Sequence, residues 1–332
     1  MLRTRLKSLG VYKPKKVVTN KDLEKYMDTS DEWIVQRSGI SERRWVEPGE
    51  TLLSMATSAS NQALSRASLT ANDIDAIIYT SLLSDYIFPG TGCLLQRELG
   101  CSDTIPALDI RNQCSGFLYA LSVADAWIRA GFYKRILISA AEIHSTSLDL
   151  TTRGRDISVL FGDAAASCIV EACKESEPHI IRHHLASEGA NAEKLFLAKP
   201  SPNDFPRIDP KSWDDSDIYP YMDGRFVFKN AVERMTQSLT RVLKEESLKP
   251  TDLDFVVAHQ ANMRINQMVL DQLGLSPTKT HHTIDRYGNT TACTIPLTLD
   301  EAIQHAKVKS GDLVGLVAFG SGFTWGSCLL RI

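Results

Sequence analysis

An internal repeat at an almost constant offset is the feature that most limits how this chain can fold. Two segments, "LTANDIDAIIYTS" at 69–81 and "LKPTDLDFVVAHQ" at 248–260, share a polar turn, a D-hydrophobic-D step and a β-branched run. A second pair of segments places a glycine turn before an apolar run, and its glycines, Gly131 and Gly311, are also about 180 residues apart. Any α/β protein alternates such segments, but a constant offset favours duplication of one α/β unit.

The duplication predicts two α/β halves, 1–175 and 176–332, each with a mostly buried sheet that helices cover. Between the repeated segments lie two polar loops, "DIRNQCSGF" and "IDRYGNTTA", and each loop opens a helix. The two loops should therefore meet at one central interface.

The stretch 186–224, rich in Pro, Asp and Ser, is expected to form a long excursion in the second half. Apolar residues every three or four positions then predict a helix, at Val227, Ala231, Met235, Leu239 and Val242.

Composition excludes several classes of protein. The 332 residues, 43% hydrophobic and 23% charged with a net charge of -3, suffice for two domains and carry no basic excess that would indicate a nucleic-acid partner. No apolar run approaches the roughly 18 residues of a membrane span, and "MLRTRLKSLGVYKPKK" lacks the apolar core of a secretory signal. Seven cysteines without a C-x-x-C pair predict free thiols in a reducing cytoplasm, with neither disulfides nor a metal site.

Cys114 stands at a junction that suits a nucleophile. It lies between a short β-like run and a long amphipathic helix in "ALDIRNQCSGFLYALSVADAWIRAG" at 107–131. Unpaired N–H groups and the positive end of the helix dipole at such a junction stabilise a thiolate over a thiol. The alternative for a lone cysteine is a small, inert, buried hydrophobe.

Two further polar residues occupy comparable junctions. His259 follows an apolar strand-like run and precedes a helix, and Asn289 stands behind a glycine in a tight loop. Alone, the histidine would be structural and the asparagine a turn residue or helix cap. Because open α/β sheets place functional groups at strand ends, Cys114, His259 and Asn289 together predict a nucleophilic site.

The run Gly320-Ser321-Gly322 follows another buried strand, in "VAFGSGFTWGSCLLRI". Glycines let the backbone approach a ligand and present N–H groups, which suit an oxyanion. A simple hairpin turn before the last strand explains the run equally well.

Six ordered motifs resemble the β-ketoacyl-[acyl-carrier-protein] synthase III family of the thiolase superfamily, over almost the whole chain. They are the Cys114 loop and "TSDEWIVQRSGI" (29–40), "TRGRDISVLFGD" (152–163), "HQANMRI" (259–265), "YGNTTACTIP" (287–296) and "FGSGFTWG" (319–326). The resemblance implies a thiolase-like fold, with two pseudo-symmetric halves in a layered α-β-α-β-α core. A Cys-His-Asn set also differs from the Cys-His-His and Cys-His-Cys sets of other superfamily members, so His281 and His282 are expected to be neighbouring loop residues.

The resemblance implies a decarboxylative condensation. Cys114 would take an acyl group from acyl-coenzyme A, while backbone N–H groups of Cys114 and Ser321 hold the oxyanion. His259 and Asn289 would then bind the thioester of malonyl-acyl carrier protein, whose loss of carbon dioxide gives the attacking enolate. No metal or other cofactor is implied.

The resemblance also implies binding residues, each of which could otherwise be an ordinary surface or core side chain. Trp33, Arg37 and Arg153 would contact the adenine and phosphates of coenzyme A. The pantetheine tunnel would be lined by Gly224, Phe228, Ala261, Asn262, Arg264 and Ile265. Lys229 and Arg264 would attract the acidic carrier protein. Phe88 would enter the acyl pocket of the partner subunit in a homodimer.

Four positions depart from the family pattern and leave the acyl donor open. Thr152 replaces the usual aspartate, Ala164 and Ala166 replace glycines, and Gln113 replaces a small residue before the nucleophile. The chain could therefore initiate fatty acid synthesis or serve a specialised pathway, such as one that uses anthraniloyl groups. A third possibility is a catalytically idle acyl-binding subunit, but the intact Cys-His-Asn set argues against it.

Overall fold

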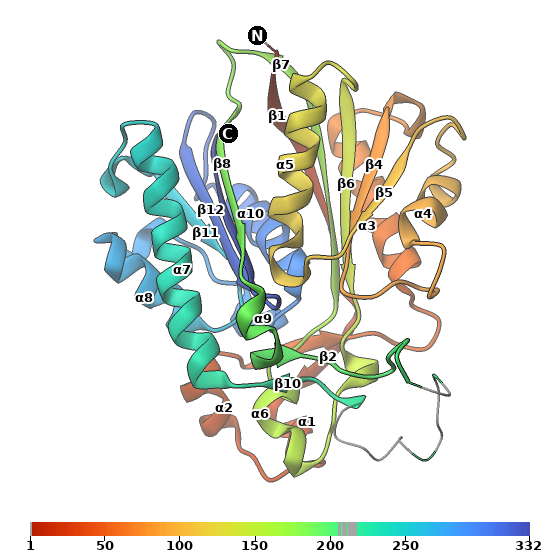
Figure 1. Cartoon of the computed structure of the whole chain (residues 1–332), viewed down its shortest axis with the longest axis vertical. Helices are drawn as coiled ribbons and strands as arrows, with labels where there is room; N and C mark the ends of the chain where they lie inside the picture. The colour runs from red at the N-terminus through yellow and green to blue at the C-terminus, as the bar shows by residue number, and fades with distance from the viewer. Residues whose placement is uncertain (1, 205–206, 208–210, 212–217) are drawn as a thin grey trace.

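Two sheets face each other across a pair of central helices in the computed structural model, which describes residues 2–204, 207, 211 and 218–332 (Figure 1). The first sheet has the order β1-β7-β6-β4-β5, with β1 (Leu2–Tyr12), β7 (Ala164–Lys174), β6 (Arg135–Glu142), β4 (Ala76–Thr80) and β5 (Ala107–Ile110). The second has the order β11-β12-β13-β8, with β11 (Phe255–Ala258), β12 (Leu313–Gly320), β13 (Thr324–Arg331) and β8 (Ile180–Ser187).

The two sheets repeat one pairing pattern. In the first, β1 and β7 pair antiparallel, β7 and β6 antiparallel, and β6, β4 and β5 parallel. In the second, β8 and β13 pair antiparallel, β13 and β12 antiparallel, and β12 and β11 parallel, while a parallel bridge from Val256 to Thr280 takes the place of a fifth strand. The repeated sequence segments form β4 and β11 in one pair and β6 and β12 in the other, so equivalent segments occupy equivalent places.

The strands of the first sheet end at Lys174 and those of the second begin at Ile180. The expected boundary near residue 175 therefore falls in the turn between β7 and β8. As a division into two domains it stays a prediction, because both sheets share one core.

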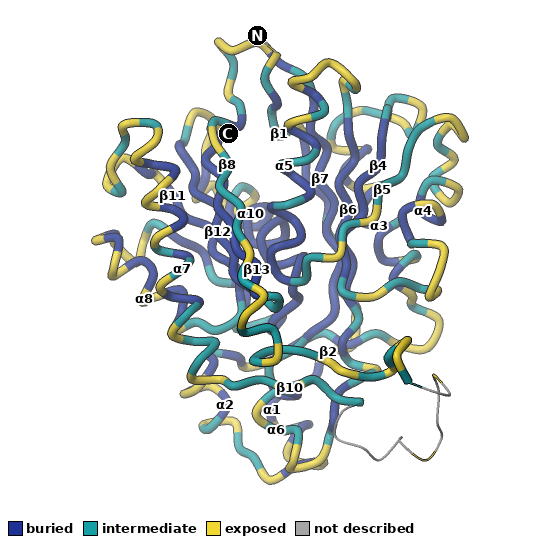
Figure 2. Tube along the Cα trace, in the orientation of Figure 1, coloured by how far each residue is buried: buried dark blue, intermediate teal, exposed yellow. Residues whose placement is uncertain are grey.

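The shared core is formed by two buried helices, α5 (Gly116–Arg129) and α10 (Thr294–Gln304). Phe117 and Leu121 of α5 and Ile295 and Leu299 of α10 pack with apolar side chains of both sheets and are at most 1% exposed. Burial of each such side chain stabilises the fold by about 1.5–3 kcal/mol. Figure 2 shows the central strands and helices as the most buried part of the chain.

Outer helices complete five layers. The helices α3 (Leu52–Ala67) and α4 (Thr91–Leu99) cover the first sheet, and α7 (Gly224–Glu245) and α8 (Met263–Leu273) cover the second. The apolar stripe predicted on α7 is confirmed, since its residues from Ala231 onward are buried against the second sheet. Asp223 caps this helix by accepting a hydrogen bond from the Phe226 N–H at 3.2 Å.

Smaller elements gather at one end of the sheets (Figure 1). They are the hairpin of β2 (Lys16–Thr19) and β3 (Glu42–Trp45), the antiparallel pair of β9 (Leu195–Phe196) and β10 (Tyr221–Met222), and the helices α1 (Asn20–Leu23), α2 (Asp31–Ser38), α6 (Arg155–Ser158) and α9 (Ile284–Tyr287). The predicted excursion at 186–224 supplies β9 and β10, and part of it lies outside the described residues.

Within the described residues, no helix has the length and apolar character that crossing a bilayer requires. All seven cysteines are free thiols.

Candidate active site

The two polar loops form equivalent turns at the starts of the central helices. The short 3₁₀ turns Gln113–Ser115 and Thr291–Cys293 lead directly into α5 and α10. The first residue of each turn has a left-handed backbone, with φ of 42° at Gln113 and 46° at Thr291. Few residues other than glycine adopt this conformation, so tertiary contacts must hold both turns. The duplication thereby presents two sharp turns to one interface.

A cavity of about 100 Å³ lies at this interface. It is lined by Cys114, His259 and Asn289 together, so the three predicted catalytic residues share one site. Of the expected tunnel residues, the cavity is lined by Gly224, Phe228, Ala261, Asn262 and Ile265. It is also lined by Leu160, Phe161, Phe319 and Gly320 from two of the motifs, and by residues outside the motifs: Leu195, Met222, Val227, Ala231 and Met235. Val227, Ala231 and Met235 belong to the apolar stripe predicted on α7. The periodicity of that stripe indicates burial in the core and gives no sign of a cavity.

Cys114 is 8% exposed, and its surroundings favour the neutral thiol. Burial, followed by the negative charge of Glu142, raises its pKa to about 12. Hydrogen bonds from the backbone N–H groups of Cys114 and Ser321 act in the opposite direction. The expected preference for a thiolate is therefore outweighed by burial. The two opposing donors are the groups expected to form the oxyanion hole, an assignment that stays a prediction.

His259 is buried and neutral, and one ring nitrogen remains available. Burial lowers its pKa to about 3. Nδ1 lies 2.7 Å from the Thr294 hydroxyl oxygen, and that hydroxyl donates to the Thr291 carbonyl at 2.9 Å. A hydroxyl that donates elsewhere accepts from the ring, so the proton sits on Nδ1. The buried Nε2 has no hydrogen-bond partner among the described residues and can accept a proton.

Asn289 is fixed through both its backbone and its side chain. Its backbone N–H donates to the Leu160 carbonyl at 2.8 Å, and its carbonyl accepts from Gly162 at 3.1 Å. Its side-chain Oδ1 accepts from the Thr291 N–H at 2.9 Å. The Oδ1 contact leaves the Nδ2 amide group as the donor. Gly162 is required because a Cβ there would lie 2.1 Å from the Tyr287 carbonyl oxygen.

The four residues that depart from the family pattern each have a defined place in the local structure. Thr152 accepts a hydrogen bond from the Asp28 N–H at 3.0 Å. Ala164 and Ala166 are buried within β7. Gln113 supplies the left-handed residue of the nucleophile turn.

The residues expected to bind the nucleotide lie at the end of the molecule that carries α2 and α6. The Trp33 ring is flanked by the guanidinium of Arg37 at 4.3 Å and that of Arg155 at 4.9 Å. The motif analysis identified Arg37 but missed Arg155. Arg153, which is expected to contact the nucleotide together with Trp33 and Arg37, pairs with Asp149 at 2.7 Å.

Arg153 also lines a second cavity of about 400 Å³, with Tyr219 and Met222 among its walls. The guanidinium of Arg153 lies 5.5 Å from the Tyr219 ring. Met222 lines this cavity and the cavity at Cys114. The two spaces are therefore neighbours.

Two exposed cations lie beside the tunnel residue Phe228. Lys229 follows it on α7, and the Arg264 guanidinium lies 5.6 Å from its ring. Asn262 caps α8 by accepting from the Arg264 N–H, and its amide donates to the Arg37 carbonyl, both at 2.9 Å. Asn262 therefore connects α8 to α2 as well as lining the cavity.

Phe88 is 83% exposed and stands in an apolar loop with Ile87 and Tyr86, which are 72% and 57% exposed. Ordinary core packing, the alternative explanation for Phe88, is wrong.

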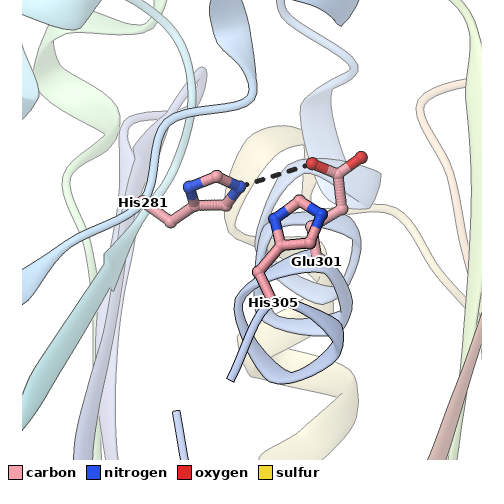
Figure 3. Close-up of side chains that lie close together, drawn as sticks. All are labelled: His281, Glu301 and His305. Carbon is pink, nitrogen blue, oxygen red and sulfur yellow. Dashed lines mark hydrogen bonds and ion pairs between the residues drawn. The ribbon is translucent and has the colours of Figure 1, made fainter. Parts of the chain in front are cut away.

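His281 contributes to a separate cluster with Glu301 and His305 (Figure 3). The potential ligand atoms of these three side chains lie within 4.8 Å of one another. The Glu301 carboxylate is already contacted by Arg286, Tyr287 and Lys13, and His281 Nδ1 by Lys307. The positive charges of Arg286, Lys13 and Lys307 oppose a bound cation. Neither His281 nor His282 lines the cavity at Cys114.

Comparisons with known proteins agree with this arrangement. The model of 3-oxoacyl-[acyl-carrier-protein (ACP)] synthase III matches residues 108–189, and that of its C-terminal region matches residues 243–332. A β-ketoacyl-[acyl-carrier-protein] synthase III of Thiobacillus denitrificans is 39% identical over 331 residues, with both chains fully covered. One of Sodalis glossinidius is 42% identical over 328 residues, 99% of each chain. The crystal structure of 3-oxoacyl-[acyl-carrier-protein] synthase III from Aquifex aeolicus is 40% identical, with a TM-score of 0.90 over 99% of this chain and 100% of that one.

The fold and the site together define a thiolase-like condensing acyltransferase, which confirms the predicted fold class. Within that class, the chain belongs to the β-ketoacyl-[acyl-carrier-protein] synthase III family.

Proposed function

We propose that this chain condenses an acyl-coenzyme A primer with malonyl-acyl carrier protein through an acyl-Cys114 intermediate, and so initiates fatty acid synthesis. The observation that carries the proposal is the single cavity lined by Cys114, His259 and Asn289. The alternative donors of specialised pathways have less support, because the full-length relatives cited above carry the name β-ketoacyl-[acyl-carrier-protein] synthase III.

In the first half-reaction, Cys114 Sγ bonds to the acyl carbon and the bond from that carbon to the coenzyme A sulfur breaks. The unpartnered Nε2 of His259 accepts the thiol proton, which then passes to the departing coenzyme A thiolate. The N–H groups of Cys114 and Ser321 hold the oxyanion. Removing one such preorganised donor typically lowers the rate by about 10²–10³.

In the second half-reaction, the malonyl carboxylate leaves as carbon dioxide and its electron pair forms an enolate. The enolate carbon attacks the acyl carbon, and the Cys114 thiolate departs and takes a proton from solvent. Asn289 Nδ2 and His259 Nε2 donate to the thioester oxygen. His259 donates in its other neutral tautomer, in which Nε2 carries the ring proton and the Thr294 hydroxyl turns to donate to Nδ1.

The surrounding residues support the assignment of the substrates. Trp33, Arg37 and Arg155 form a stack of the kind that holds a purine and its phosphates. The exposed charges of Lys229 and Arg264, beside a tunnel residue, suit an acidic carrier protein. No resident metal or cofactor is required for the two steps.

We also propose a homodimer that works in the cytoplasm. The exposed apolar loop at Phe88 suits burial against a second copy of the chain, where the ring would close the partner's acyl pocket. Seven free thiols suit a reducing compartment.

Two measurements test this function. Intact-protein mass spectrometry after incubation with a panel of acyl-coenzyme A donors should show one acyl adduct, on Cys114, and should rank the donors. His259→Ala and Asn289→Ala should still acquire this adduct, more slowly for His259→Ala, but should fail to condense it with malonyl-acyl carrier protein. Condensation by either variant at the wild-type rate would contradict the assigned roles.

A further inference from the structure

We propose that Thr291, held between Glu142 and His144, is the positioning residue that aims the Asn289 amide into the cavity. The inference rests on the proposed role of Asn289 as a donor to the malonyl thioester. None of the motif arguments identified Glu142, His144 or Thr291 as functional.

Thr291 contacts three groups at once. Its backbone N–H donates to Asn289 Oδ1 at 2.9 Å. Its hydroxyl oxygen lies 3.1 Å from His144 Nε2. Its side chain also hydrogen-bonds the Glu142 carboxylate. Thr291 therefore connects a buried acid and a buried imidazole to the catalytic amide.

The protonation of the neighbours gives these hydrogen bonds one direction. Burial raises the pKa of Glu142 to about 7, so the direction is that of its ionised form, in which the carboxylate accepts and the single hydroxyl proton of Thr291 points to it. The hydroxyl oxygen then accepts the proton of His144 Nε2. Burial keeps His144 neutral by lowering its pKa to about 4, so Nε2 carries the one ring proton.

Glu142 is a rigid anchor for this chain of hydrogen bonds. It is 1% exposed at the end of β6. Its carboxylate accepts from the Leu82 N–H at 3.1 Å and the Ser81 hydroxyl at 3.2 Å. It also accepts from the backbone of Ala292. The end of β6 and the segment after β4 thus hold the turn that starts α10.

The anchor is needed because the turn is strained. Thr291 is β-branched and has a φ of 46°, a conformation that such a residue keeps only where the surrounding structure holds it. Release of the hydroxyl would let the turn relax and move the Thr291 N–H away from Asn289 Oδ1. The amide could then rotate and present its oxygen, instead of Nδ2, to the thioester oxygen.

Thr291→Val tests the proposal because valine keeps the β-branched shape and the backbone N–H but lacks the hydroxyl. We expect acylation of Cys114 within twofold of wild type, measured by intact mass, and condensation with malonyl-acyl carrier protein lowered by about 10–100-fold. Thr291→Ser, which restores the hydroxyl, should regain condensation to within about threefold. Thr298→Val is the matched control, because it removes a buried hydroxyl that pairs with Thr283 at 2.7 Å, and should leave both half-reactions unchanged.

Condensation by Thr291→Val at the wild-type rate would overturn the proposal, and so would an equal loss of both half-reactions. Should Thr291→Val fail to fold, His144→Phe and His144→Gln decide in its place. Phenylalanine removes the donor and should reproduce the selective loss, whereas glutamine keeps a donor and should restore condensation; equal rates for the two would refute the chain of hydrogen bonds. Asn289→Ala run alongside separates the hypotheses, because full condensation by that variant would refute the proposed function itself.

Discussion

A single methyl group added at Gly320 should disable the nucleophile. The glycine ends β12 and lies directly against Cys114. A Cβ at this position would lie 2.7 Å from Cys114 Cβ, 3.1 Å from its backbone nitrogen and 3.2 Å from Sγ. The φ of Gly320 is outside the left-handed region, so alanine introduces no backbone strain of its own. The perturbation is purely steric.

The size of the effect follows from the overlap. Non-bonded carbons prefer separations of about 3.5–4.0 Å, so Gly320→Ala must move Cys114 or the β12 backbone by about 1 Å. Overpacking of this kind costs about 1–3 kcal/mol of stability. A displacement of 1 Å at a reacting group lowers the rate about 100-fold, which corresponds to about 2.7 kcal/mol in the activation free energy.

The assay is the rate of acyl-adduct formation on Cys114, followed by intact mass, together with the free energy of unfolding in urea. Gly189→Ala is the matched control, because a Cβ at Gly189 meets no atom within 4 Å and its φ is also ordinary. We expect the control to acylate like wild type. Acylation of Gly320→Ala at the rate of the control would refute the reasoning, since the nucleophile would then tolerate the methyl group.

Three further predictions concern the nucleophile, the acyl pocket and the response to acid. Cys114→Ser should fold like wild type and acquire no acyl adduct by mass spectrometry, and an adduct on another cysteine of wild type would contradict the assignment. Phe88→Ala should accept longer acyl-coenzyme A donors, because each methylene bound in an apolar pocket contributes about 1–3 kcal/mol. An active enzyme that light scattering shows to be a monomer, or a donor-length profile that the substitution leaves unchanged, would argue against the role of Phe88. Burial lowers the pKa of His144 to about 4, so its contribution to stability is complete above the unfolded value near 6.5 and is lost as the pH falls towards 4. His144→Gln should therefore reduce the pH dependence of the unfolding free energy by about 1.4 kcal/mol per pH unit between pH 6 and 4.5, and unchanged dependence would contradict a neutral buried imidazole.

Much of the fold could be predicted because the duplication is visible in the sequence. Segments with the same pattern form β4 and β11, and the apolar stripe after the excursion forms α7. The family and the fold class are confirmed by the full-length relatives. The roles of Cys114, His259 and Asn289 stay predictions that their shared cavity supports.

The remaining parts of the site depend on contacts between residues far apart in the chain. Arg155 and Trp33 come from different helices, and Arg155 lies two positions after Arg153, the arginine that the resemblance indicated. Glu142 lies in a buried strand, where composition offers no sign that its carboxylate reaches Thr291. Helix-terminus arguments also favoured a thiolate at Cys114, but they omit the burial that raises its pKa.

The turn between β7 and β8 separates the proposed nucleophile from its two proposed partners. A chain cut there would leave Cys114 on one fragment and both His259 and Asn289 on the other, while α5 and α10 would still share one apolar core. Each fragment would expose that core when alone, and only reassociation would rebuild the cavity. The condensation activity of a mixture of the two fragments would therefore measure how much of them has reassociated.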